Sequence, residues 1–141
     1  MIIREAVTTA DLDAYYAIRV EVFMQGQGVT EAEEFDGLDN TAIHLLGLDK
    51  GTPVAALRLR KLGAMGKIER VAVLEAHRKK GYARAIMRAA LERLTADPEI
   101  SEAFLSAQTY IIPFYESMGF VAEGPEYLDA GIPHRDMRMT L

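Results

Sequence analysis

The sequence predicts one α/β domain, residues 1–141, built as a mixed sheet with helices on its faces. Three observations lead to this fold class. The chain has 141 residues, which suits a single domain. Half of these residues are hydrophobic and 26% are charged, an ordinary composition for a globular protein. Segments that alternate like strands are interleaved with segments of helical periodicity, which is typical of α/β architecture.

The first half of the chain predicts one helix among four strands. Thr8 or Thr9 can cap a helix that ends near Gly26 and Gly28. Five acidic residues lie between residues 29 and 40, where we expect a solvated loop. Their charge also suits attraction of a cationic amine, which is the alternative. The strands are expected over residues 2–7, 42–48, 53–62 and 67–74.

The second half contains the most regular helix, expected over residues 81–96. Asp97-Pro98 ends it, because proline cannot continue a helix. Pro113 suits the first turn of a short helix that runs to residue 118. Strands are expected over residues 103–107, from residues 120–123 onward, and over 134–141. The helix over 81–96 has an apolar stripe formed by Ala83, Ile86, Met87, Ala90, Leu91 and Leu94.

Composition excludes several classes of function. The chain has no cysteine, which rules out disulfides, thiolate metal sites and a cysteine nucleophile. A net charge of −5 argues against non-specific nucleic-acid binding. No apolar run is long enough to span a bilayer, and no signal-peptide pattern is visible. We therefore expect a cytoplasmic protein with no nucleic-acid or membrane partner. Three scattered histidines predict no metal site.

A basic loop precedes the helix over residues 81–96. Arg78, Lys79 and Lys80 lead into Gly81, and a helix N-terminus follows. Unpaired N–H groups, a partial positive charge and a glycine that permits close approach favour a phosphate or pyrophosphate ligand. Residues 78–93 hold six Lys or Arg and one acid in an otherwise acidic chain. The alternative is an ordinary solvated helix start.

At this loop the chain resembles the GNAT superfamily of acetyl-CoA-dependent N-acetyltransferases. Arg78-Lys-Lys-Gly81-Tyr-Ala83 matches the family signature [Arg/Gln]-x-x-Gly-x-[Gly/Ala]. Phe114-Tyr115-Glu-Ser-Met-Gly119-Phe120 matches a second family element downstream. The resemblance covers nearly the whole chain and implies a mixed, mostly antiparallel sheet of six to seven strands with about four helices.

The resemblance narrows to the ElaA/YjcF-like branch. Arg19-Val-Glu-Val-Phe23, Leu105-Ser-Ala-Gln108 and Gly131-Ile-Pro-His134 are similar to segments of that branch. Two positions depart from common family patterns. Gln108 stands where many members have asparagine, and Met24-Gln25-Gly26-Gln27 replaces a glutamate-glutamine pair.

The resemblance implies acetyl-CoA as co-substrate and a particular set of residues that bind it. The backbone of the strand before the loop would hold the pantetheine arm, and one N–H would polarise the thioester carbonyl. No metal is implied. The residues carried over to this role are Val71, Ala72, Val73, Arg78, Lys79, Lys80, Gly81, Tyr82, Ala83, Arg84, Gln108 and Phe114.

Two residues are the catalytic candidates. Tyr115 falls on the family's general-acid position, and a phenol can return a proton to a departing thiolate. Its alternative is a packed aromatic in a short helix. Glu69 is the best base candidate, acting through a water, with ion pairing as the alternative. Strand periodicity places Lys67 on the face of Glu69 and Arg70 on the opposite face.

The acceptor is expected to be a small-molecule or peptide amine, which the sequence does not identify. Phe23, His44 and His134 are the candidates for its pocket. Without cysteine, direct transfer is favoured over a cysteinyl intermediate. Two other functions stay open: a non-catalytic CoA-binding module, and an acyltransferase that uses a longer acyl donor. The family is compatible with a homodimer.

Overall fold

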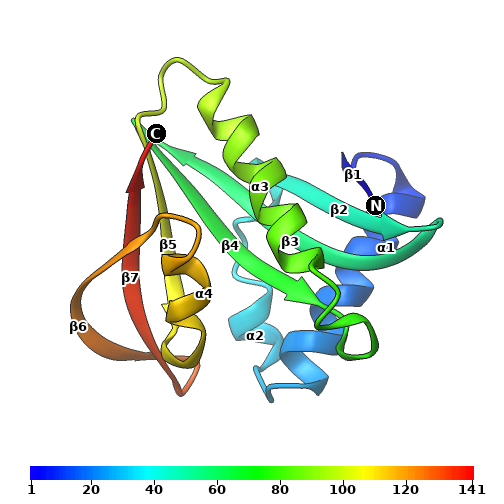
Figure 1. Ribbon diagram of the computed structural model, residues 1–141. Helices are drawn as coiled ribbons and strands as arrows, with labels where there is room; N and C mark the ends of the chain where they lie inside the picture. The colour runs from blue at the N-terminus through cyan, green and yellow to red at the C-terminus, as the bar shows by residue number, and fades with distance from the viewer.

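The computed structural model describes residues 1–141 as one seven-stranded sheet with helices on both faces (Figure 1). Helices α3 and α4 cover one face, and α1 and α2 lie on the other (Figure 1). The strands are β1 (Ile2–Glu5), β2 (Ile43–Asp49), β3 (Thr52–Leu62), β4 (Met65–Val73), β5 (Glu102–Gln108), β6 (Val121–Asp129) and β7 (Ile132–Thr140). The helices are α1 (Thr9–Arg19), α2 (Glu31–Glu34), α3 (Tyr82–Thr95) and α4 (Ile112–Glu116).

This architecture confirms the predicted fold class of a mixed, mostly antiparallel sheet with four helices. The strand order is β1-β2-β3-β4-β5-β7-β6, and only β4 and β5 run parallel. Two short features were not expected. A π-helical segment, Val20–Gln25, continues α1, and the acidic stretch forms α2 behind a capping box between Thr30 and Glu33.

The sheet divides the core into two parts. Sixteen buried residues form the cluster on the α3 and α4 face, and nine form the cluster beneath α1. Gly66 shows how tightly α3 packs on β4, since a Cβ there would lie 2.5 Å from a methyl carbon of Leu94. Both faces of the central strands are therefore buried, which fixes the register of β3 and β4.

Strands β4 and β5 diverge after a short parallel pairing. Their register joins only Met65–Lys67 to Glu102–Phe104. Beyond Lys67, the edge of β4 that faces β5 has no strand partner, although β4 stays paired with β3 (Figure 1). The separation leaves main-chain N–H and C=O groups available to a ligand between the two strands.

A β-bulge in β4 corrects one expectation about side-chain direction. Ala56 pairs with Ala72 but Arg58 pairs with Glu69, so two residues of β4 oppose one residue of β3. Arg70 has φ 55°, in the left-handed region. The extra residue interrupts the alternation of a regular strand. The prediction that Arg70 points away from Glu69 is wrong, because both side chains join ion pairs with the α2 side of the sheet.

Candidate functional site

A cavity of about 690 Å³ occupies the space where β4 and β5 diverge. Its lining comes from both strands, from the N-terminus of α3, from α4, from the segment around α2, and from the β6–β7 hairpin. The volume lies within the range of small-molecule and cofactor sites. The cavity therefore brings the basic loop and the two catalytic candidates to a common site.

The N-terminus of α3 forms one end of this cavity. Gly81 is the residue before the helix, with φ 83°, and a Cβ there would meet no atom within 4 Å. The helix has no side-chain cap, so its first N–H groups have no side-chain acceptor at the cap position. Arg78 donates a hydrogen bond from Nε to the Val73 carbonyl at 3.1 Å, which joins the loop to the end of β4. This end of the cavity fits a pyrophosphate group.

Most of the predicted cofactor residues line the cavity. Lys80 is the exception, because its side chain is not part of the lining. The residues that do line it are Val71, Ala72, Val73, Arg78, Lys79, Gly81, Tyr82, Ala83, Arg84, Gln108 and Phe114.

Tyr115 also lines the cavity, from α4. Its side chain is 7% exposed, packs edge-on to Phe114 and Phe120, and its hydroxyl has no hydrogen-bond partner in the protein. Burial raises the pKa of Tyr115, and the nearby Tyr110 adds to the effect. The phenol is therefore protonated at neutral pH, the form that a proton donor needs.

Glu69 lies on the β4 side of the same cavity, and its carboxylate forms ion pairs with three basic side chains. Its carboxylate lies 2.5 Å from Arg58, 2.7 Å from Arg60 and 3.1 Å from Lys67. Burial alone would raise the pKa of Glu69, but these three cations outweigh burial and lower it to about 2. A carboxylate this acidic accepts a proton from an amine poorly.

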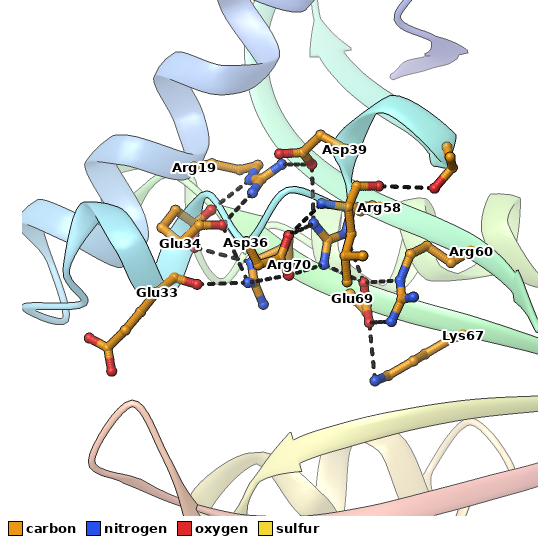
Figure 2. A network of polar contacts seen from close by, with 12 residues as sticks. Arg19, Glu33, Glu34, Asp36, Asp39, Arg58, Arg60, Lys67, Glu69 and Arg70 are labelled. Atoms are coloured by element: carbon orange, nitrogen blue, oxygen red, sulfur yellow. Dashed lines mark hydrogen bonds and ion pairs between the residues drawn. The ribbon is translucent and has the colours of Figure 1, made fainter.

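Glu69 belongs to a larger ionic cluster that joins α1 and α2 to β3 and β4 (Figure 2). Two arginines at its centre are buried, Arg19 at 0% and Arg58 at 1% exposure. Arg19 pairs with Glu34 and Asp39, each at 2.6 Å. We call this set the ionic cluster: Arg19, Glu34, Asp36, Asp39, Arg58, Arg60, Lys67, Glu69 and Arg70.

The ionic cluster corrects the expectation of a solvated acidic loop. Glu34 is 1% exposed, and Asp36 accepts hydrogen bonds from Arg58 and Arg70. The acids at residues 34, 36 and 39 therefore bind the protein's own arginines, and their charge is not free to attract a cationic amine. Glu31 stays on the exposed surface. Sequence reasoning missed this because an ion pair between distant residues leaves no local pattern.

The fold places only some of the three candidates for the acceptor pocket at the cavity. Phe23 and His134 line the cavity, whereas His44 does not. His44 packs against Tyr15 and Tyr16, and its Nε2 lies 3.0 Å from the Asp39 carbonyl. Burial lowers the pKa of His44. The structure thus brings only two of the three candidates to the site.

The two positions that depart from common family patterns meet across the cavity. The Gln108 amide donates to the Gln27 Oε1 at 2.9 Å, and the Gln27 amide donates back at 3.4 Å. Both residues line the cavity. They lie 81 positions apart in the chain, so no spacing rule could have paired them.

Two further structural findings concern metal-ligand groups and membrane-spanning helices. No group of three or more His, Cys, Asp or Glu side chains could hold a metal ion. None of the helices combines the length and apolar character required to traverse a bilayer.

The fold and the cavity define a class of mixed α/β proteins with a ligand site between two diverging parallel strands, and comparison with known proteins identifies the family. The model of the "Acetyltransferase (GNAT) domain" family matches residues 11–141. The chain belongs to this GNAT family.

Relatives place the chain in the ElaA/YjcF-like branch. It is 44% identical to the uncharacterized N-acetyltransferase YjcF of Bacillus subtilis over 126 residues, 89% of each chain. The crystal structure of Escherichia coli ElaA superposes with a TM-score of 0.86 at 27% identity, covering 98% of both chains. A putative N-acetyltransferase from Lactobacillus plantarum gives a TM-score of 0.91 at 26% identity, covering 99% of this chain and 97% of the other.

Proposed function

We propose that this GNAT domain transfers an acetyl group from acetyl-CoA directly to the amine of a small molecule or peptide. One observation carries the proposal. A single cavity joins the loop at residues 78–83 to the unpaired edge of β4 and to Tyr115. Acetyl-CoA carries a diphosphate, then an extended amide arm, then the reacting thioester. The loop, the edge of β4 and Tyr115 suit these three groups in that order. Acetyl-CoA supplies the thioester that is attacked.

The chain's own groups bind the co-substrate in two ways. Main-chain N–H groups at Gly81 and the start of α3 donate hydrogen bonds to the pyrophosphate, with Arg78, Lys79 and Arg84 adding positive charge. The free edge of β4 at Val71–Val73 pairs with the pantetheine arm as an added strand would. A main-chain N–H on that edge polarises the thioester carbonyl.

Tyr115 is the proton donor in this proposal. Its hydroxyl is protonated, faces the cavity and has no competing hydrogen bond. Transfer of that proton to the departing sulfur avoids release of a free thiolate. The absence of cysteine supports transfer in a ternary complex, since no thiol could carry the acetyl group.

Glu69, the candidate for a water-mediated base, lines the cavity on the acceptor side. Its lowered pKa weakens that role. A carboxylate paired with Arg58, Arg60 and Lys67 orders a water or an amine more readily than it removes a proton.

Two measurements test the function together. Thermal unfolding with acetyl-CoA, free CoA and ATP asks whether the cavity binds this co-substrate. A ligand at about 100 times its Kd stabilises by roughly 2.7 kcal/mol, enough to raise Tm by several degrees. We expect a shift with acetyl-CoA and CoA but not with ATP. In Gly81→Glu the shift should disappear, because an acidic side chain would occupy the anion site.

CoA release in the presence of an amine panel then separates the alternatives. Amino acids, polyamines, aminoglycosides and peptide N-termini are the amines to test. Binding of acetyl-CoA without release of CoA would favour a non-catalytic CoA-binding module. Preference for a longer acyl-CoA would favour an acyltransferase with a different donor. Size-exclusion chromatography measures whether a homodimer forms.

A further inference from the structure

The imidazole of His134 lines the cavity and has no role in the acetyl transfer described so far for Tyr115 and the edge of β4. His134 lies on β7, is 8% exposed, and lines the same cavity as Tyr115 and Glu69. Its Nδ1 lies 2.6 Å from the Ile132 carbonyl oxygen. A carbonyl oxygen only accepts hydrogen bonds, so Nδ1 carries the proton. In the neutral ring the lone pair is then on Nε2.

The Nε2 atom has access to the cavity. No protein group hydrogen-bonds to it, and no carboxylate forms an ion pair with the ring. The buried ring nitrogens that lack a partner belong instead to His44 and His77. A lone pair that is neither buried nor occupied is available to a ligand in the cavity.

Neighbouring strands hold the ring in place. His134 lies opposite Gln108 on β5 and opposite Tyr127 on β6. The Tyr127 ring stacks on the imidazole, with centroids 6.2 Å apart and planes at 22°. The Tyr127 hydroxyl in turn donates to Asp136 at 2.6 Å. The orientation of the imidazole is therefore set by one hydrogen bond and one stacked ring.

His134 faces the acceptor side of the sheet. Met137 and Met139 of β7 pack in the core on the α3 and α4 face. Strand alternation then directs His134 to the opposite face, as it directs Gln108 on β5, whose amide reaches Gln27. Glu69 and Lys67 of β4 lie on this same face, where Lys67 reaches over the Phe104 ring of β5.

We propose that His134 is the general base that removes a proton from the acceptor amine. This inference rests on the proposed acetyl transfer. The ammonium gives one proton to Nε2, and the neutral amine then attacks the thioester carbon. A C–N bond forms and the C–S bond breaks as the Tyr115 hydroxyl protonates the sulfur. The second amine proton restores that hydroxyl, and the imidazolium releases its proton to water.

Several charged and titratable groups surround the imidazole of His134. Asp136 lies two residues along β7, Asp129 and Tyr127 lie on β6, and Tyr110 follows β5. Lys67, Glu69 and Arg70 lie on β4 across the cavity. Glu69 is occupied by three cations, so it does not compete for the amine proton.

Steady-state kinetics with the best amine of the panel test the role. We expect His134→Gln to lower kcat/KM by about 10²–10³-fold and to remove the acidic limb of its pH profile. Arg135→Gln, the next residue on the strand and outside the cavity, should match the wild type. The acetyl-CoA thermal shift should persist in both variants. Full turnover in His134→Gln with an intact acidic limb would overturn the assignment.

A second test needs no acceptor and keeps the two proposals separable. Diethyl pyrocarbonate acylates unprotonated imidazole nitrogens that solvent can reach. Peptide mass mapping should find His134 modified faster than His44. No modification at His134 would show that Nε2 is not available, and this would overturn the base role while leaving acetyl-CoA binding intact. Absence of turnover with every amine would remove the proposed function, and the base role with it.

Discussion

The two walls of the cavity differ in whether their polar groups have partners within the protein. The wall formed by α2 and β4 carries Glu34, Lys67, Glu69 and Arg70 of the ionic cluster, in which each acid is paired with at least one arginine or lysine (Figure 2). The wall formed by α4 and β5–β7 contains Tyr115 and His134, whose hydroxyl and Nε2 atoms have no hydrogen-bond partner in the protein. Both walls line the same space.

The difference shows that a titratable residue in a cavity is not by itself a reactive one. Glu69 has the residue type and the position of a base, but its cations stabilise the ionised form. Those pairs hold α2 and the sheet together, because removal of one partner would leave a buried charge uncompensated. We therefore expect substitutions in the ionic cluster to reduce stability, and substitutions in the opposite wall to reduce turnover.

The largest expected effect is that of Tyr115→Phe on turnover. Loss of the proton donor should lower kcat by about 10²–10⁴-fold with little change in CoA affinity. The free energy of unfolding should stay close to that of the wild type, since the hydroxyl makes no hydrogen bond in the protein. Chemical denaturation and CoA-release kinetics on one sample compare the two. Unchanged turnover would remove the general-acid role.

Arg58→Met, in contrast to Tyr115→Phe, should mainly reduce the free energy of unfolding. Removal of a buried arginine leaves Asp36, Asp39 and Glu69 with fewer partners, which should cost about 3–5 kcal/mol of unfolding free energy. Arg93→Met is the matched control, because its pair with Glu5 is exposed and should contribute about 1 kcal/mol or less. Urea titration measures both. Equal losses in the two variants would contradict a special role for the ionic cluster.

Acid should weaken the ionic cluster. The pKa of Glu69 in the folded chain is about 2, below the ordinary value of 4.5. A lowered folded-state pKa contributes stability that is complete above the ordinary pKa and is lost as the pH falls toward the folded value. The free energy of unfolding should therefore fall between about pH 5 and pH 2, by on the order of 3 kcal/mol from this group.

A Glu69→Gln variant isolates that contribution. Its loss of stability over the same pH interval should be smaller than that of the wild type, as followed by urea titration at each pH. Glu34 acts in the opposite direction, because burial raises its pKa. Identical acid profiles for the variant and the wild type would assign the pH dependence to other carboxylates.

The smallest expected effect on stability is that of the hydrogen-bonded amides of Gln27 and Gln108, which join the two walls of the cavity. Gln27→Ala, Gln108→Ala and the double variant form a thermodynamic cycle. Their hydrogen bonds predict a coupling of about 0.5–1.5 kcal/mol. Gln27→Ala combined with Arg93→Ala should be additive within about 0.5 kcal/mol. Additivity in the first cycle as well would mean that the two walls are not linked through these side chains.

Local pattern was sufficient for much of the fold. Hydrophobic periodicity, proline and glycine predicted α3, α4 and most strands to within a few residues. The basic loop and the glycine before α3 predicted where the proposed anion site lies, because a helix terminus and its preceding residues are contiguous in sequence. The extent of β6 was missed, since that exposed edge strand has little apolar alternation.

The sequence by itself determined the family, the helix N-terminus before which Gly81 lies, and the residue types available for proton transfer. Tertiary structure alone decided which of these residues have no ion-pair or hydrogen-bond partner in the protein. The bulge at Arg70 reversed a side-chain direction that strand alternation predicts. Glu69 gained three cations from neighbouring positions on β3 and β4, and His134 gained a fixed tautomer and an open Nε2. Basicity depends on burial and on charges brought close by folding, and neither is a property of the residue type.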